Sequence, residues 1–287
     1  MSNSKNEGII LITMDVEPDL AKYLKNSYEG MKIIPRFVDL LDKHGIKCDF
    51  FVTSNIAQKF GELTREIIRR GHSIGCHGSD HSVEYYCLKK SQWQFDEIKK
   101  SSEIIEKAAG RKVNMFRAPN FSANGDTIQV LEKLGYKIDS SVLPGRLAMK
   151  WKVFPIYDFT NAPAEPYNPS KENIAENGES PVIELPLTEN PDSPGAPVGV
   201  GYLNLCGVEK TMKLIDRIKH PYVTFLLHPW ELVDIGKNHP NLPACWKKGC
   251  RDSFEELEAL FKRMKEKYMF SSLMGVSNTF SIAREKK

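Results

Sequence analysis

Residues 71–81 read GHSIGCHGSDH, and the rest of the chain is organised around them. The stretch opens as an apolar run punctuated by glycine, which predicts a short buried strand, and ends in His77 and His81. If the chain turns helically after the strand, a spacing of four brings both imidazole rings to one side. Two imidazoles at one strand end suit a transition metal, most often zinc. The same spacing also fits two surface histidines on a polar turn, so the pair alone leaves both interpretations open.

Apolar runs and amphipathic stretches alternate on both sides of this segment. The runs predict strands at 8–14, 48–53, 71–77, 114–117, 136–139, 182–186 and 222–227, and helices at 31–44, 62–70, 91–109, 126–134, 208–218 and 255–268. This order predicts right-handed βαβ units and a mostly parallel sheet. Asp15, His77, Arg117 and Asp139 stand at the C-terminal side of strands, the end at which α/β barrels carry their chemistry.

The composition is that of an ordinary globular protein. The chain has 287 residues and a net charge of +3, and it has neither a strongly basic patch nor an acidic tail, so no nucleic-acid partner is expected. The N-terminus lacks a signal-peptide pattern, and no apolar run reaches the roughly 18 residues of a membrane span. We therefore expect a cytoplasmic protein without a transmembrane segment.

The regular pattern fails between Pro144 and Pro197. Ten of the chain's 17 prolines fall there. Aromatic residues (Trp151, Phe154, Tyr157, Phe159 and Tyr167) give the segment apolar surface to bury, so it is expected to be an ordered lid or insert at about 144–200. We treat residues 1–287 as a single domain that carries this insert and a C-terminal helix at about 252–268.

Two acidic residues follow the first predicted strand. Asp15 and Glu17 are two apart, and in a strand such residues point the same way. One carboxylate could bind a metal while the other acts as a base, but two solvated acids leading into a loop fit the pattern as well.

Five segments in order give a more specific indication. They are MDVE (14–17), HGSDH (77–81), FRAP (116–119), DSS (139–141) and LHPWE (227–231). With them, residues 8–235 or so resemble the NodB-homology polysaccharide deacetylases, carbohydrate esterase family 4. The Asp-x-Glu opening, the Asp-Ser-Ser-x-x-Pro run and the His-Pro-Trp-Glu ending resemble the branch associated with exopolysaccharide gene clusters.

The resemblance implies a distorted (β/α) barrel of about seven mostly parallel strands that hydrolyses an N-acetyl group on an amino sugar. It implies one divalent metal, most often zinc, with cobalt, nickel or iron as alternatives. The resemblance implies that Asp15 is the general base, that His228 is the general acid, and that Glu17, His77 and His81 bind the metal. Arg117 and Asp139 would complete the catalytic set, with Arg117 orienting Asp15. Pro119, Asn120 and Trp230 would lie on the substrate and oxyanion side.

Three departures from the family pattern matter. The family's commoner opening has adjacent aspartates, so the roles of Asp15 and Glu17 can be exchanged. Gly78 stands where Ser or Thr is usual, and the tryptophan often found near the fourth motif is missing.

Other functions compete with this one. The expected substrate is an N-acetylated sugar of a surface polysaccharide or glycan precursor, nucleotide-linked or lipid-linked. A deformylase or another amidohydrolase would use the same site, and a carbohydrate-binding barrel that has lost catalysis belongs to a different class. Two histidines and one carboxylate also suit non-haem iron oxygenases, but a base paired with Arg117 and an acid at His228 favour hydrolysis.

Overall fold

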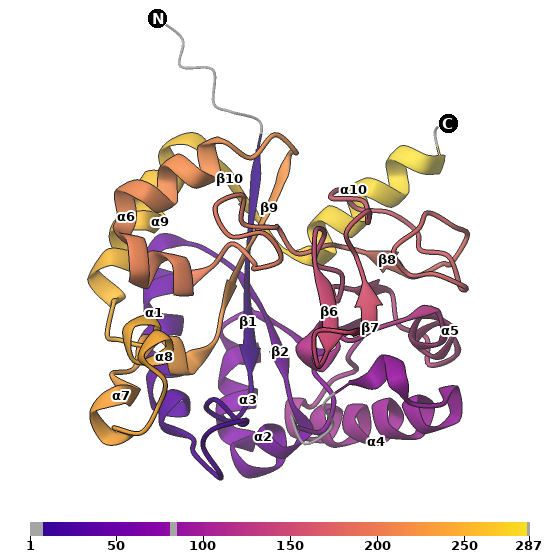
Figure 1. Ribbon diagram of the computed structural model, residues 1–287, viewed down its shortest axis with the longest axis horizontal. Helices are drawn as coiled ribbons and strands as arrows, with labels where there is room; N and C mark the ends of the chain where they lie inside the picture. The colour runs from indigo at the N-terminus through magenta and orange to yellow at the C-terminus, as the bar shows by residue number, and fades with distance from the viewer. Residues whose placement is uncertain (1–7, 81–84, 286–287) are drawn as a thin grey trace, which may run out of the picture.

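The structure is a computed structural model that describes residues 8–80 and 85–285. Its main feature is one curled sheet of eight parallel strands (Figure 1). The strands are β1 (Ile9–Val16), β2 (Cys48–Val52), β3 (Ser73–Cys76), β4 (Met115–Phe116), β5 (Ile138–Asp139), β8 (Ile183–Glu184), β9 (Tyr222–Leu227) and β10 (Met269–Ser271).

The eight strands occupy only seven places side by side, because β2 and β10 pair with different parts of the same side of β1. The lateral order is β9-β1-β2-β3-β4-β5-β8, and β10 shares one side of β1 with β2. β10 pairs with residues 9–11 of β1, and β2 pairs with residues 12–16. The gap between β8 and β9 is bridged by residues 187–199, where the amide of Leu226 donates to the carbonyl of Val198 at 2.9 Å. The predicted distorted barrel of about seven parallel strands is therefore confirmed.

Helices cover the outside of this barrel. They are α1 (Ile34–His44), α2 (Ser54–Lys59), α3 (Gly61–Arg69), α4 (Ser91–Ala109), α5 (Gly125–Lys133), α6 (Val200–Asp216), α7 (Ile235–Asn238), α8 (Ala244–Gly249), α9 (Phe254–Lys267) and α10 (Leu273–Glu285), with short 3₁₀ turns η1 (Glu29–Ile33), η2 (Tyr86–Leu88), η3 (Pro119–Phe121) and η4 (Pro229–Leu232). No helix in the described ranges is both long and apolar enough to cross a membrane.

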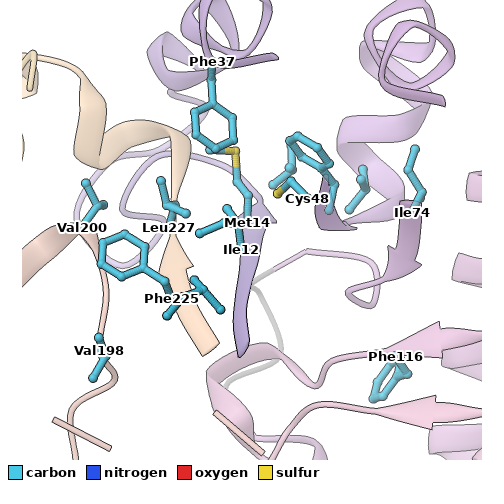
Figure 2. Close-up of a cluster of buried hydrophobic side chains, with 14 of the residues drawn as sticks. Ile12, Met14, Phe37, Cys48, Ile74, Phe116, Val198, Val200, Phe225 and Leu227 are labelled. Carbon is cyan, nitrogen blue, oxygen red and sulfur yellow. The ribbon is translucent and has the colours of Figure 1, made fainter. Parts of the chain in front are cut away.

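Alternation along β1 divides the interior into two parts. Ile12 and Met14 point outward into the large core beneath the helices, where they lie near Phe37 of α1 and Leu227 of β9 (Figure 2). Side chains in a strand alternate between the two faces, so the residues between them point into the barrel. Leu11 belongs to a separate apolar cluster inside the barrel, and Asp15 comes later on the same face. The barrel thus has an apolar floor and a polar mouth.

The floor is closed by α10, a helix that the sequence did not predict. Leu273 and Val276 of α10 pack with Leu11 inside the barrel. The amide of Leu273 donates to Oδ2 of Asp49 at 2.8 Å, so a β2 carboxylate caps the start of the helix. Asp49 is fully buried, and this burial raises its pKa to about 6.

The insert also differs from the prediction. It contains an antiparallel hairpin of β6 (Leu147–Lys150) and β7 (Phe154–Asp158), which forms a sheet of its own. Tyr157, Phe159 and Tyr167 are buried as expected, but Trp151 and Phe154 are 76% and 59% exposed, so for these two the expectation was wrong.

Two local predictions need comment. α6 consists of two helical segments separated by Gly207, whose φ of 78° is not helical, so the helix predicted from residue 208 corresponds to the second segment and only the first, from Val200, was not predicted. A helical turn was also considered after the strand that ends in His77. The structure has no helix at residues 77–80, which follow β3 as an irregular segment. His81 lies outside the described residues.

Candidate active site

Asp15 and Arg117 form a buried ion pair at the mouth of the barrel. Nη1 of Arg117 donates to Oδ1 of Asp15 at 2.7 Å and to the hydroxyl of Thr13 at 3.1 Å. Nε of Arg117 donates to the carbonyl of Ser140 at 2.8 Å, and Nη2 donates to the Ser140 hydroxyl at the same distance. Phe51 lies 4.1 Å beneath the guanidinium. With every face of Arg117 in contact, the orientation of Asp15 is fixed.

His77 follows β3 and faces the same carboxylates. Its Nδ1 lies 2.7 Å from the carbonyl oxygen of Arg117, which can only accept, so Nδ1 carries the proton. In the neutral ring, Nε2 then presents its lone pair 3.3 Å from Oε2 of Glu17 and 3.9 Å from Oδ2 of Asp15. A metal-binding histidine usually donates one ring N–H to a backbone carbonyl or carboxylate, as Nδ1 of His77 does here, which orients the other nitrogen toward Glu17.

His228 approaches from the opposite side of β1, where β9 lies. It follows β9, and its Nε2 lies 4.0 Å from Oδ2 of Asp15 and 3.9 Å from Oε1 of Glu17. Its Nδ1 lies 3.1 Å from Oε2 of Glu231, and its ring stacks on Trp230 at 4.6 Å. Burial lowers the pKa of His228, but the neighbouring carboxylates, first that of Glu231, raise it to about 9. The ring is therefore a proton donor at neutral pH.

The turn after Pro119 is strained. Asn120 and Phe121 have φ values of 56° and 58°, in the left-handed region that costs non-glycine residues roughly 1–2 kcal/mol each. The hydroxyl of Tyr157 donates to the carbonyl of Asn120 at 2.8 Å, and Nε of Arg146 donates to the same hydroxyl at 3.0 Å. The insert therefore holds this turn in place.

Asp139 lies deeper than the other predicted site residues. It sits opposite Glu184 in the β5–β8 register, and both side chains are fully buried. Burial raises the pKa of Asp139 to about 6, and burial together with the Asp139 carboxylate raises the pKa of Glu184 well above its usual value. Oδ1 of Asp139 accepts from the Ser141 hydroxyl at 2.6 Å, and that hydroxyl accepts from the amide of Ala118 at 2.9 Å. Asp139 thus reaches the Pro119 turn through Ser141.

The structure brings together most of the predicted site. Asp15, Glu17, His77, Arg117 and His228 converge, and Trp230 stacks on His228. Within the described ranges, no group of three or more His, Cys, Asp or Glu side chains has the arrangement of a metal site. The third expected ligand, His81, is outside those ranges.

Sequence reasoning missed three contributors. Glu231 holds His228, and its place in LHPWE, three residues after the histidine, is the spacing of a capping box. Tyr157 and Glu184 reach the site from the insert, and no local pattern identified them.

Several known proteins to which this chain is similar in sequence are described as deacetylases. Residues 2–138 match the family model described as polysaccharide deacetylase. The peptidoglycan deacetylase of Helicobacter pylori is 28% identical over 116 residues, which are 40% of this chain and 39% of that protein. The peptidoglycan-N-acetylglucosamine deacetylase of Bacillus cereus is 27% identical over 118 residues, which are 41% of this chain and 38% of that protein. The matches thus span about two fifths of these relatives.

Solved structures share the fold over nearly the whole chain. A candidate polysaccharide deacetylase from Mycobacterium smegmatis superposes with a TM-score of 0.68 at 17% identity, covering 99% of this chain and 93% of its own. A carbohydrate esterase family 4 pseudoenzyme from Bacillus anthracis gives a TM-score of 0.55 at 14% identity, covering 95% of this chain and 66% of its own.

Proposed function

Since this chain belongs to the polysaccharide deacetylase family of the NodB type, carbohydrate esterase family 4, we propose that it is a hydrolase that removes an N-acetyl group from an amino sugar. The observation that most supports this is the placement of Asp15. One of its oxygens is held by Arg117, and the other lies about 4 Å from both His77 and His228. A base, an acid and a set of metal-binding donors thus meet around one small space.

Amide hydrolysis needs a nucleophilic water, a polarised carbonyl and a protonated leaving amine. Asp15, oriented by Arg117, takes the proton from the attacking water at Oδ2. His228, held through Nδ1 by Glu231, donates a proton from Nε2 to the departing nitrogen. The amide that follows Pro119 donates to the oxyanion that forms on the former carbonyl.

Glu17, His77 and His81 would hold one divalent metal. Glu17 and His77 fit this role because a carboxylate faces an imidazole nitrogen whose ring is fixed by a backbone carbonyl. When bound, a zinc, cobalt, nickel or iron ion acidifies water and polarises a carbonyl. His81 enters this set on the sequence motif alone.

The substrate is proposed to be an N-acetylated sugar of a surface polysaccharide or glycan precursor, in nucleotide-linked or lipid-linked form. Trp230 was expected on the substrate side, but it is only 5% exposed because its ring stacks on His228 and packs against Trp246, so it supports the imidazole and offers little surface to a sugar. Residues 144–200 are proposed to select the sugar, since their hairpin contacts the Asn120 turn.

Release of acetate from a panel of substrates tests the proposal. The panel contains chito-oligosaccharides, peptidoglycan fragments, and nucleotide-linked and lipid-linked N-acetyl amino sugars, each also as the N-formyl analogue. We expect acetate release that falls about 10²–10⁴-fold in His228→Ala. Formate release alone would assign a deformylase. Folded, metal-loaded protein that releases neither acid would favour an inactive carbohydrate-binding barrel.

A further inference from the structure

The end of the β6–β7 hairpin exposes an unusual amount of apolar surface. Ten large apolar side chains are exposed among the described residues, and five of them lie within residues 147–154, here called the hairpin tip. They are Leu147 (47%), Met149 (36%), Trp151 (76%), Val153 (65%) and Phe154 (59%). Single exposed apolar residues are ordinary, whereas a contiguous group marks an interaction site.

Positive charge surrounds this apolar group. Lys150 and Lys152 are exposed within the tip, and Nζ of Lys150 lies 4.8 Å from the ring centre of Trp151. No Asp or Glu occurs in residues 140–157, and the first acidic residue after them, Asp158, lies opposite Leu147 at the base of the hairpin, away from the turn. The turn η2 lies against β7, with the Cys87 thiol 3.7 Å from the carbonyl of Ile156, and the exposed Leu88 follows directly. The next two residues are Lys89 and Lys90, so lysines flank the apolar surface on this side as well.

The backbone at the tip is strained, and the side chains there gain little stabilising burial in return. Trp151 and Lys152 have φ values of 52° and 60°, a region that bulky L-residues rarely adopt. Strain at a position with little burial costs stability and is typical of functional sites. At Trp151 this backbone conformation holds a tryptophan, the largest of the side chains, in solvent.

We propose that the hairpin tip is a docking surface for a lipid bilayer that carries anionic headgroups. Tryptophan and phenylalanine beside aliphatic residues, flanked by lysines, are the side chains that bind the bilayer interface. Apolar side chains enter the acyl boundary while the lysines stay at the level of the anionic headgroups, where each contributes roughly 1 kcal/mol.

Two other occupants fit less well. A glycan surface needs polar side chains to bind hydroxyl groups, and between residues 147 and 154 the only polar side chains are the two lysines. A second copy of this chain in a symmetric dimer would bring the tip lysines of both subunits together, with no acidic residue in the tip to pair with them.

The docking surface and the site are parts of one element. Tyr157 in β7 binds the carbonyl of Asn120, while Phe154 begins the same strand. A bilayer at the tip therefore lies on the side of the barrel mouth that the Pro119 turn forms. This link to a lipid-linked sugar rests on the proposed function, but the docking itself does not.

Co-sedimentation with vesicles tests the docking. The probes are large unilamellar vesicles of phosphatidylcholine alone and of phosphatidylcholine with phosphatidylglycerol, at low and high salt. We expect the full chain to bind the anionic vesicles, and Trp151→Ser with Phe154→Ser to lose binding. Lys150→Glu with Lys152→Glu should weaken it by roughly tenfold or more. Binding of wild-type protein should fall as salt rises.

The matched control is Leu205→Ser with Met269→Ser, which removes two apolar side chains of similar exposure elsewhere. This variant should bind like wild type. Three results would overturn the proposal: no binding to anionic vesicles, equal binding by the tip variant and wild type, or a dimer that the tip variant alone abolishes. Acetate release from a soluble N-acetyl sugar is followed in parallel, so that loss of docking and loss of the proposed activity are distinguished.

Discussion

Asp15 and Glu17 are chemically similar neighbours with different surroundings. Oδ1 of Asp15 is bound to the buried Arg117, whereas Glu17, just beyond the end of β1, lies closest to the imidazole of His77. The arginine neutralises one carboxylate, which leaves Glu17 as the better partner for a cation. The structure thus favours the assignment of Asp15 as base, which the sequence had left open.

Asp15→Asn should abolish turnover and keep about one equivalent of divalent metal, because the amide keeps the shape of the carboxylate but cannot take a proton. Glu17→Gln should lose metal first. Metal analysis of the purified variants, together with acetate release, measures both effects. Swapped results, with metal lost in Asp15→Asn and retained in Glu17→Gln, would exchange the two roles.

Metal content also tests the histidine pair. His77→Ala combined with His81→Ala should purify without the metal, since it removes two of the three proposed ligands. His72→Ala combined with His220→Ala is the control, because neither histidine belongs to the cluster. A double variant at 77 and 81 that keeps the full metal content would exclude the proposed site.

The site residues that could be predicted from the sequence share one property: each stands at or shortly after the C-terminal end of a strand, within a short motif. His77 and His228 are examples, and the parallel sheet then brings them together without further information. Tyr157 and Glu184 could not be predicted in this way. Their contacts to the site depend on how a long segment folds back over the barrel, and a single sequence does not specify that path.

At the scale of elements, the hairpin and the Pro119 turn act as one unit. Tyr157 ties β7 to the carbonyl of Asn120, and Arg146 lies over the ring of Phe121 at 5.4 Å. Two consecutive left-handed residues keep their conformation only where the surroundings over-determine it. The amide geometry after Pro119 is therefore maintained by the insert.

Tyr157→Phe should lower kcat with little change in metal content, because the turn loses the hydroxyl that fixes its carbonyl. Tyr167→Phe is a matched control, since its hydroxyl donates to the carbonyl of Ile174 at 2.6 Å within the same insert. Both variants should lose about 1 kcal/mol of unfolding free energy. Equal kcat in the two variants would show that the hydroxyl of Tyr157 is only structural.

The strands and helices of the barrel were predictable because their apolar periodicity is strong. α4 spans Ser91–Ala109, the same residues as predicted, since Gly110 ends it in the left-handed conformation. The β6–β7 hairpin was missed because its turn residues, Trp151 and Lys152, replace the Asn-Gly or Gly-Gly pair that signals such a turn. Its exposed apolar residues gave no alternation that indicates a buried face.

At the scale of the whole molecule, the C-terminal helix completes the core. Leu273 is fully buried and packs inside the barrel with residues of the central strands. Leu273→Ala should therefore lower the free energy of unfolding by about 2–5 kcal/mol. Urea unfolding measures it, with the exposed Ile282→Ala on the same helix as control. An equal effect in both variants would mean that α10 does not fill the barrel.

Asp49 makes stability depend on pH. The unfolded chain releases this proton near the ordinary value of 3.8, whereas the folded chain keeps it until about pH 6. The unfolding free energy thus falls as pH rises from about 4 to 6, by a total of about 3 kcal/mol. Asp49→Asn should remove that loss, and so be more stable relative to wild type at pH 7.5 than at pH 4. Urea unfolding of this variant and of the exposed Asp39→Asn tests it, and an unchanged pH slope would contradict it.

The division of one side of β1 between β2 and β10 has a consequence for biosynthesis. Residues 9–11 are synthesised long before their partner strand, which begins at Met269. At ordinary translation rates the nascent chain waits on the order of tens of seconds before that partner is made. Until then, the first strand has an open apolar edge, the kind of surface that chaperones cover. The floor end of the barrel, opposite Asp15 on the same strand, is therefore completed by a contact between segments about 260 residues apart in the sequence, and such long-range closure is slow.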